Sequence, residues 1–241
     1  MKLNYNFNML SIIIPTLNEE DYLPMLLKSI KKQDFKDYEI IVADAGSKDK
    51  TLEIAKKYGC VTTRGGAPAR GRNAGAKIAK GEIMFFLDAD TVLPDDFFKK
   101  SLEEFNLRKL DFASFCFDSP SKENAFHFML DFYNKMVVML EKITPYSIIG
   151  VLIKKDFFDK TKGYDETLKL SEDRDFGARA AEHGKFGIIR SAQVFISDRR
   201  FKKDGWATTT IKYLLSELYT FFIGPVRSDI FNYKFNHYKD N

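Results

Sequence analysis

The first hundred residues alternate between short apolar segments and segments of helical periodicity, and this alternation constrains the fold more than any other feature. Apolar runs at 10–14, 39–44, 60–63 and 82–87 predict four strands, the first of them stopped by Pro15. Helical spacing predicts helices around 22–30, at 51–58 after a Ser47 or Asp49 cap, and at 69–80 before Gly81. Strands that are apolar on both faces and separated by helices predict a Rossmann-like, mostly parallel sheet with helices on both faces.

Composition limits the domain count and the partners. The chain has 241 residues, enough for one large α/β domain, and 38 basic against 34 acidic residues give a net charge of +4. This excess is too small, without a basic stripe, to indicate nucleic acid as a partner. Cys60 and Cys116 lie in strand-like segments without metal-ligand spacing and are predicted to be reduced core residues, which is typical of a cytoplasmic protein.

Polar and acidic residues follow three of the predicted strands. They are Asn18, Glu19 and Glu20 after the first strand, Asp44, Ser47 and Asp49 after the second, and Asp88 and Asp90 after the fourth. For each group alone, helix capping or a solvated turn is as good an explanation as a binding site. Because ligands of open α/β sheets bind at the carboxyl ends of the strands, three such groups on one edge favour a binding site.

The segment MFFLDADTVLPDDF, residues 84–97, places Asp88 and Asp90 where a buried strand stops. Two carboxylates inside the strand would cost several kcal/mol unless they were paired or bound to a cation. We therefore expect them at the end of the strand, facing a cleft.

Four ordered motifs, SIIIPTLNE, IVADAGSKDKT, ARGRNAGAKIAKGEIMFFLDADT and LSEDRDFGAR, make residues 9–200 resemble the family 2 glycosyltransferases, whose nucleotide-sugar-binding fold is called GT-A. The resemblance implies an inverting, metal-dependent enzyme that uses a UDP- or GDP-sugar. In that family the Asp-x-Asp motif binds Mn²⁺ or Mg²⁺ against the diphosphate of the donor, which makes Asp88 and Asp90 the expected metal ligands.

The resemblance also assigns the donor site. Thr16 and Glu19 match residues near uracil and ribose, and Asp44 matches a carboxylate that contacts the base. Arg70 and Arg72 match basic residues near the diphosphate, and a solvated helix start is the alternative. The same motifs add Pro15, Gly46, Ser47, Asn73, Asp88 and Ala89 to the expected donor-binding residues. Many members have a second aspartate where this chain has Ala45, which makes the identity of the base less secure than diphosphate binding.

The second half resembles the acceptor region of the family. We expect a donor half at about 9–110 and an acceptor half at about 111–205, which together form a GT-A domain over 1–205. Gly150 and Gly163 match places where the backbone approaches the donor sugar or turns sharply. Glu172 and Asp173 match the catalytic pair, with Asp173 as the general base. For Ser171 or Glu172, helix capping is the alternative, and an acceptor that is already anionic would need no base.

Arg199 and Arg200, in SDRRF, match an Arg-Arg pair that offsets diphosphate charge, and a solvated basic loop is the alternative. The Gln-x-x-Arg-Trp motif of processive synthases is absent, which indicates transfer of a single sugar. Two other functional classes stay open: a nucleotidyltransferase that makes a nucleotide sugar, and a non-catalytic sugar-binding module.

The C-terminal residues 206–241 are predicted to form an amphipathic helical tail, with a broad apolar face over 206–224. This helix either packs on the domain or lies in a membrane interface, where it would bring the enzyme to a lipid-linked acceptor. No apolar run reaches the roughly 18 to 20 residues of a spanning helix. The expected location is therefore the cytoplasm, with peripheral contact to the inner face of the membrane as the second possibility.

Overall fold

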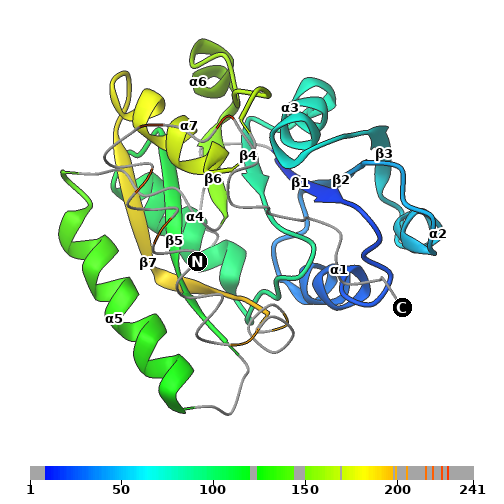
Figure 1. Cartoon of the computed structure of the whole chain (residues 1–241), viewed down its shortest axis with the longest axis horizontal. Coiled ribbons are helices and arrows are strands. Elements are labelled where there is room, and N and C mark those ends of the chain that lie inside the picture. The colour runs from blue at the N-terminus through cyan, green and yellow to red at the C-terminus, as the bar shows by residue number, and fades with distance from the viewer. Residues whose placement is uncertain are drawn as a thin grey trace.

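The computed structural model describes residues 9–119, 124–143, 150–168 and 170–197, and positions 199, 205, 215, 219, 224 and 227. Its centre is a seven-stranded sheet with the order β3-β2-β1-β4-β6-β5-β7 (Figure 1). The strands are β1 (Leu10–Thr16), β2 (Tyr38–Asp44), β3 (Val61–Arg64), β4 (Ile83–Phe86), β5 (Phe112–Asp118), β6 (Val151–Lys154) and β7 (Phe186–Phe195). Strand β6 runs antiparallel to β4 and β5, and the other pairs are parallel. The predicted mostly parallel α/β sheet is confirmed.

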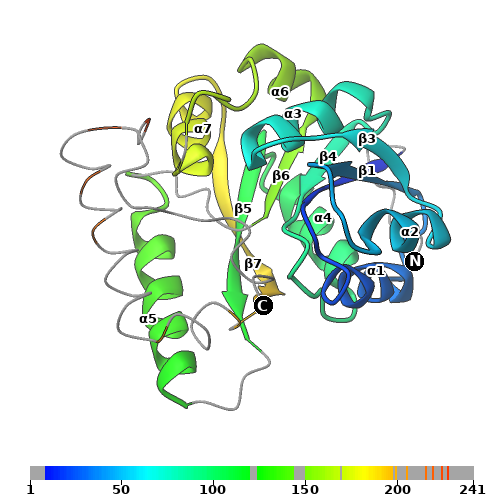
Figure 2. The ribbon, with the colours of Figure 1, turned by 45° about the vertical axis from the view of Figure 1, so that its right-hand side comes forward.

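Helices cover both faces of the sheet, as Figure 2 also shows. They are α1 (Leu23–Lys32), α2 (Thr51–Lys57), α3 (Pro68–Ile78), α4 (Phe97–Leu107), α5 (Asn124–Leu140), α6 (Lys155–Lys160) and α7 (Glu172–Ala181). Helices α1, α2 and α4 contribute to the core on one face, and α3, α6 and α7 contribute to the core on the other.

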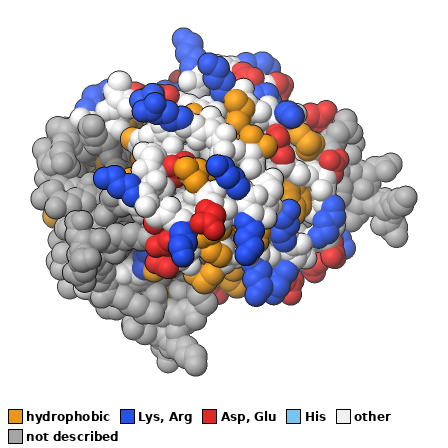
Figure 3. All heavy atoms as spheres, turned by 90° about the vertical axis from the view of Figure 1, so that its right-hand side faces the viewer, with side chains coloured by type: hydrophobic (Ala, Val, Ile, Leu, Met, Phe, Trp, Pro, Cys, Tyr) orange, Lys and Arg blue, Asp and Glu red, His pale blue; other side chains and the backbone are white. Residues whose placement is uncertain are grey.

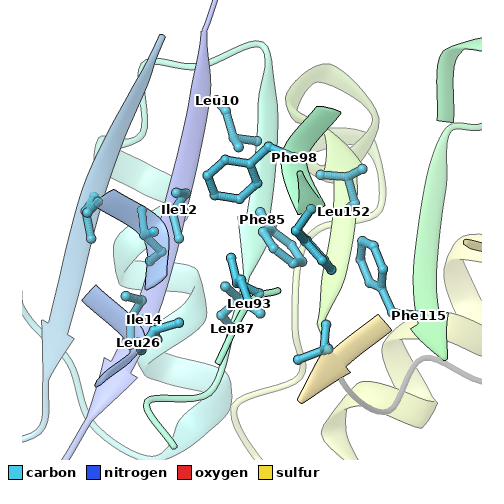
Figure 4. Packing of buried hydrophobic residues seen from close by; sticks show 14 of the residues in the cluster. Leu10, Ile12, Ile14, Leu26, Phe85, Leu87, Leu93, Phe98, Phe115 and Leu152 are labelled. Atoms are coloured by element: carbon cyan, nitrogen blue, oxygen red, sulfur yellow. The ribbon is translucent and has the colours of Figure 1, made fainter. Parts of the chain in front are cut away.

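Side chains of β1 alternate between these two cores because successive strand residues point to opposite faces. Leu10, Ile12 and Ile14 belong to the core with α1 and α4, whereas Ile13 belongs to the core with α3. In the first core, Figure 4 shows Phe85 and Phe98 among these aliphatic side chains. Burial on both faces explains why the strands read as continuous apolar runs.

Strand β1 extends two residues beyond its predicted end and includes Pro15. The pairing of β1 with β4 stops at Ile13, so Pro15 pairs with β2 alone, opposite Ala43. A proline, which has no N–H, is tolerated where one side of the strand is unpaired. The strand therefore reaches Thr16, at the edge of the site.

Helix α4 is tied to β7 through Glu104. Its carboxylate accepts hydrogen bonds from the backbone N–H groups of Arg190 (2.9 Å) and Ser191 (2.8 Å) and from the Arg108 guanidinium (2.8 Å). Burial alone would raise the pKa of Glu104, but these hydrogen bonds to its ionised form outweigh burial and hold the pKa below its ordinary value.

Both cysteines are free, and burial raises the pKa of the Cys60 thiol to about 11. Both observations agree with the prediction of reduced core residues. On the face beside β3 and α2, basic and acidic side chains are interspersed (Figure 3), so the visible described surface carries no large field of one sign. Among the helices of the described ranges, none is both long and apolar enough to cross a membrane.

Candidate donor and catalytic site

The carboxyl ends of β1, β2 and β4 meet at one edge because these strands are parallel neighbours. The loops that follow β1 and β2 bind each other: the Lys48 N–H donates to Asn18 Oδ1 (2.8 Å), and the Glu20 N–H donates to Asp49 Oδ2 (3.1 Å). The polar groups after these strands thus lie together, as the sequence predicted. Asp49 also stabilises the turn that leads into α2, because its Oδ1 accepts the Thr51 N–H at 3.0 Å.

Asp44 is buried at the end of β2 and organises the loop after it. Its Oδ1 accepts from the Thr16 hydroxyl (3.0 Å), and its Oδ2 accepts from the N–H groups of Gly46 (2.9 Å) and Ser47 (2.8 Å). Gly46 has a φ of +97°, a conformation that glycine adopts without steric cost. The predicted donor residues Thr16, Asp44, Gly46 and Ser47 therefore form one hydrogen-bonded unit.

Arg72 lies at the centre of the site and is almost wholly buried. Its guanidinium contacts Glu172 (2.8 Å), Asp88 (3.0 Å) and Asp173 (3.3 Å). The planar group thus joins the Asp-x-Asp end of β4 to the first turn of α7, residues that lie far apart in the sequence. The alternative of a solvated helix start does not hold for Arg72.

Two glycines in the ARGRNAG segment bring α3 close enough to the sheet for this contact. A Cβ on Gly75 would lie 2.4 Å from Ile13 Cγ2, and one on Gly71 would lie 3.0 Å from Pro15 Cβ. These glycines are four residues apart and so face the same side of the helix. Because any larger side chain would push α3 away from β1, the glycines fix the position of Arg72.

The first turn of α7 carries the catalytic candidates. Ser171 has a φ of +64°, and its side chain makes no capping hydrogen bond to α7. Glu172 is buried against Arg72, so side-chain capping does not account for it. Burial raises the pKa of Asp173 well above its ordinary value, and the charges of Glu172 and Asp88 add to this effect against the opposing pull of Arg72. A raised pKa is typical of a carboxylate that accepts a proton near neutral pH.

Asn73 connects α3 to the loop before α7. Its side-chain amide donates to the Tyr164 carbonyl (2.9 Å), and its Oδ1 accepts the Tyr164 N–H (2.9 Å). The buried Tyr164 ring stacks on Phe176, with centroids 4.5 Å apart, and lies 5.4 Å from the Arg72 guanidinium carbon. Gly163 has a φ of +67°, and a Cβ there would lie 2.7 Å from Asn73 Oδ1, so glycine is required at this sharp turn.

Arg199 reaches the opposite side of the site. Its guanidinium binds Glu19 through two hydrogen bonds (2.8 and 3.0 Å), its Nε lies 3.0 Å from Asp90 Oδ2, and its Cζ lies 4.4 Å from the centre of the Tyr22 ring. Burial raises the pKa of Glu19, and pairing with Arg199 offsets part of that effect. The loop before Arg199 is placed by hydrogen bonds in both directions between the backbones of Val92 and Phe195, each 2.9 Å.

The carboxylates at this site suit a divalent cation. Asp88 has a side chain that is 44% exposed, and within the described part of the chain its Oδ1 alone is bound, by Arg72. Among the side chains that the structure describes, two guanidinium groups face five carboxylates here, those of Glu19, Asp88, Asp90, Glu172 and Asp173. A diphosphate would meet this negative excess unless a cation accompanied it. Among the described residues, no group of three or more His, Cys, Asp or Glu side chains is placed to hold a metal ion.

The structure does not bring every predicted donor residue into this network. Arg70 is exposed on α3 and makes no ion pair within the described residues. Arg200 lies outside the described residues, as does most of the 206–241 tail. Tyr22 and Tyr164 contact the site but were not predicted as site residues from the sequence. The sequence indicates them only as aromatic residues that lie next to polar motifs.

Comparison with known proteins agrees with this geometry. The profile of the family described as Glycosyl transferase family 2 matches residues 11–164. TarS of Staphylococcus aureus, a poly(ribitol-phosphate) β-N-acetylglucosaminyltransferase, is 40% identical over 90 residues, which cover 33% of this chain and 16% of TarS. This chain therefore spans only part of the length of that relative.

Two solved structures have the same fold. A TarS fragment in complex with UDP-GlcNAc superposes with a TM-score of 0.62 at 23% identity, over 78% of this chain and 58% of that one. The mannosyltransferase PcManGT of Pyrobaculum calidifontis, in complex with GDP-Man and Mn²⁺, superposes with a TM-score of 0.71 at 19% identity, over 88% and 63%. Sheet order and the likeness to these structures define the GT-A fold. Because the profile match covers more than half of the sequence, the chain belongs to glycosyl transferase family 2.

Proposed function

We propose that this chain is an inverting, metal-dependent glycosyltransferase that moves a single sugar from a UDP- or GDP-sugar to an acceptor. The observation that carries the proposal is the cluster around Arg72, which holds Asp88 of the Asp-x-Asp motif and the Glu172-Asp173 pair within 3.3 Å of one guanidinium. UDP-GlcNAc and GDP-Man are the first donors to test, because neighbours of the same fold bind them.

The residues divide into donor binding and proton transfer. The unit around Asp44 would hold the nucleoside, and Asp88 and Asp90 would hold Mn²⁺ or Mg²⁺ against the diphosphate. When bound, such a cation neutralises charge on the departing nucleoside diphosphate. Arg199 offers the diphosphate a second positive charge from across the site, provided that it exchanges Glu19 or Asp90 for phosphate oxygens.

Asp173 would act as the base. The acceptor hydroxyl oxygen attacks the anomeric carbon, the bond from that carbon to the phosphate oxygen breaks, and the hydroxyl proton passes to the Asp173 carboxylate. The diphosphate leaves with the bonding electrons on the opposite face, which inverts the configuration. Arg72 holds Asp173 in position and does not take the proton, because a buried guanidinium between carboxylates stays charged; Glu172 binds the same guanidinium.

The test begins with donor use. The purified chain is incubated with UDP-GlcNAc and with GDP-Man in Mn²⁺, and release of the nucleoside diphosphate is measured. Release of pyrophosphate from a nucleoside triphosphate and a sugar phosphate would instead indicate a nucleotidyltransferase.

Asp173→Asn then tests the base. The substitution keeps an oxygen near Arg72, so donor affinity and melting temperature should hold while turnover falls by about 10² to 10⁴. Asp175→Asn is the matched control, because Asp175 lies two residues further along α7 and pairs with Arg179 at 2.8 Å. Near-normal turnover in Asp173→Asn would contradict the base assignment and favour an acceptor that is already anionic.

A further inference from the structure

Helix α5 lies at one edge of the described part of the molecule, beside β5 and β7 (Figure 1). Its inner face is fixed by Phe126, Leu130 and Val137, all buried, and by Asn134. The Asn134 side chain accepts the Phe117 N–H (3.1 Å) and donates to the Phe117 carbonyl (2.7 Å). These four positions recur at helical spacing, so one face of α5 is committed to the sheet.

The C-terminal end of α5 is held as well. Glu141, just after the helix, accepts hydrogen bonds from both Arg108 and Arg190. Rotation of α5 about its axis would break these bonds and expose Asn134. The outer face of the helix therefore cannot be buried by rolling against the domain.

That outer face carries a row of large apolar side chains. Phe128 is 76% exposed, Phe132 66%, Met139 74% and Ile143, just past the helix, 78%. Their spacings of four, seven and four residues place them on one side of the helix axis. Single exposed apolar residues are ordinary, but an aligned row over about 23 Å of helix marks an interaction surface.

The charges on this face indicate what it meets. Lys135 and Lys142 are exposed along the same side, and Asp131 is the acidic residue beside them. Lys135 stands near the midpoint between Phe128 and Ile143, so an antiparallel pairing of two α5 helices would set it against its own copy. A protein partner would also have to accept lysine within an apolar contact, where lysine is depleted. A lipid surface accommodates both the apolar side chains and the lysines, because the rings enter the interface while the lysine stems extend to the head groups.

We propose that the outer face of α5, formed by Phe128, Phe132, Lys135, Met139, Lys142 and Ile143, docks on an anionic lipid surface. The proposal does not depend on the activity proposed above. It does orient the site: His127 in the first turns of α5 contacts Asp118 at the carboxyl end of β5 (2.9 Å), and the Ile196 N–H donates to the Asp118 carbonyl (2.8 Å) in the chain that leads to Arg199. The N-terminal end of α5 is therefore the end nearer the donor site.

The test uses the full-length chain and vesicles of phosphatidylcholine, with or without phosphatidylglycerol. The parent should sediment with the anionic vesicles, and Phe128→Ser/Phe132→Ser/Met139→Ser should lose at least tenfold in partitioning. Met25→Ser/Val61→Ser, which changes exposed apolar residues of α1 and β3, is the matched control and should bind as the parent does.

Charge reversal tests whether the lysines of α5 contribute to binding the anionic surface. Lys135→Glu/Lys142→Glu should weaken binding to anionic vesicles by at least about 30-fold, since each lysine near such a surface contributes about a factor of five. Lys56→Glu/Lys57→Glu on α2 makes the same change in net charge and should have a small effect. Phe128→Trp, which removes no apolar area, should give indole fluorescence that brominated lipid quenches beyond the parent signal from Trp206.

Three results would overturn the proposal. If the parent protein stays in the supernatant with anionic vesicles, the outer face of α5 does not bind lipid. Unchanged sedimentation of the apolar variant, with Phe128→Trp unquenched, would place the contact elsewhere, for example in the 206–241 tail. A concentration-dependent dimer that the apolar variant abolishes, without vesicle binding, would make this face a contact between copies of the chain.

Discussion

Replacing Arg72 with methionine should destabilise the protein strongly. Arg72 is buried, and it faces Glu172 and Asp173, whose side chains are 12% and 17% exposed. Methionine keeps much of the volume but leaves two nearly buried carboxylates without their partner. Removing one partner of a buried ion pair costs about 3 to 5 kcal/mol. For a chain of this size, such a loss lowers the melting temperature by about 6 to 20 °C.

The loss should depend on pH, and its sign follows from Asp173. Burial, with the charges of Glu172 and Asp88, already raises the pKa of Asp173 against the pull of Arg72, and the variant removes that pull. A carboxyl whose folded pKa lies above its unfolded value of about 3.9 binds more protons in the folded state, so stability increases as the pH falls. The penalty should therefore be largest near pH 7.5 and smaller near pH 5.

Urea unfolding of parent and variant at both pH values measures this effect. Arg70→Met is the control, because Arg70 is an exposed arginine two residues away on the same helix, and its free energy of unfolding should change by less than about 0.5 kcal/mol. If Arg72→Met unfolds with the parent's free energy, or with a deficit that does not change with pH, the account of the buried charge cluster is wrong.

Three further predictions concern the metal, the sheet and helix packing. Chelation by EDTA should weaken donor binding at least tenfold and Mn²⁺ should restore it, with Asp90→Ala losing the rescue in a calorimetric titration; an affinity indifferent to EDTA would remove the metal from the mechanism. Glu104→Gln should cost about 1 to 3 kcal/mol at pH 7, because hydrogen bonds outweigh burial and hold the pKa of Glu104 below its ordinary value; the deficit should shrink as the pH falls through that lowered pKa, where the parent also loses this charge. Gly75→Ala should lower the melting temperature in a thermal scan, since overpacking against Ile13 costs about 1 to 3 kcal/mol and outweighs the roughly 1 kcal/mol gain in helix propensity; an unchanged or higher melting temperature would show that α3 is not held tightly against β1.

The strands and helices predicted in the first hundred residues, and the sheet edge that carries the candidate site, were predictable because their signals are local. Because β1, β2 and β4 are buried on both faces, their sequences are continuous apolar runs. The polar residues after each run mark the carboxyl ends of these parallel strands. Asp88 and Glu172 were picked out by motif and by resemblance, and in the structure both contact Arg72. The end of β1 was missed at Pro15, because whether a strand can hold a proline depends on which neighbours pair with it.

Only the tertiary structure decided which charges meet. Arg72 is shared by Asp88 and Asp173, and Arg199 binds Glu19 from 180 residues away. Nothing local distinguishes these arginines from exposed Arg70, because burial and pairing arise when separate elements converge at the sheet edge. The same holds for α5: helical periodicity identifies an apolar helix, but only its packing on β5 determines that Phe128 faces outward. Periodicity is a short-range property of the chain, whereas the partner of a side chain depends on elements distant in sequence.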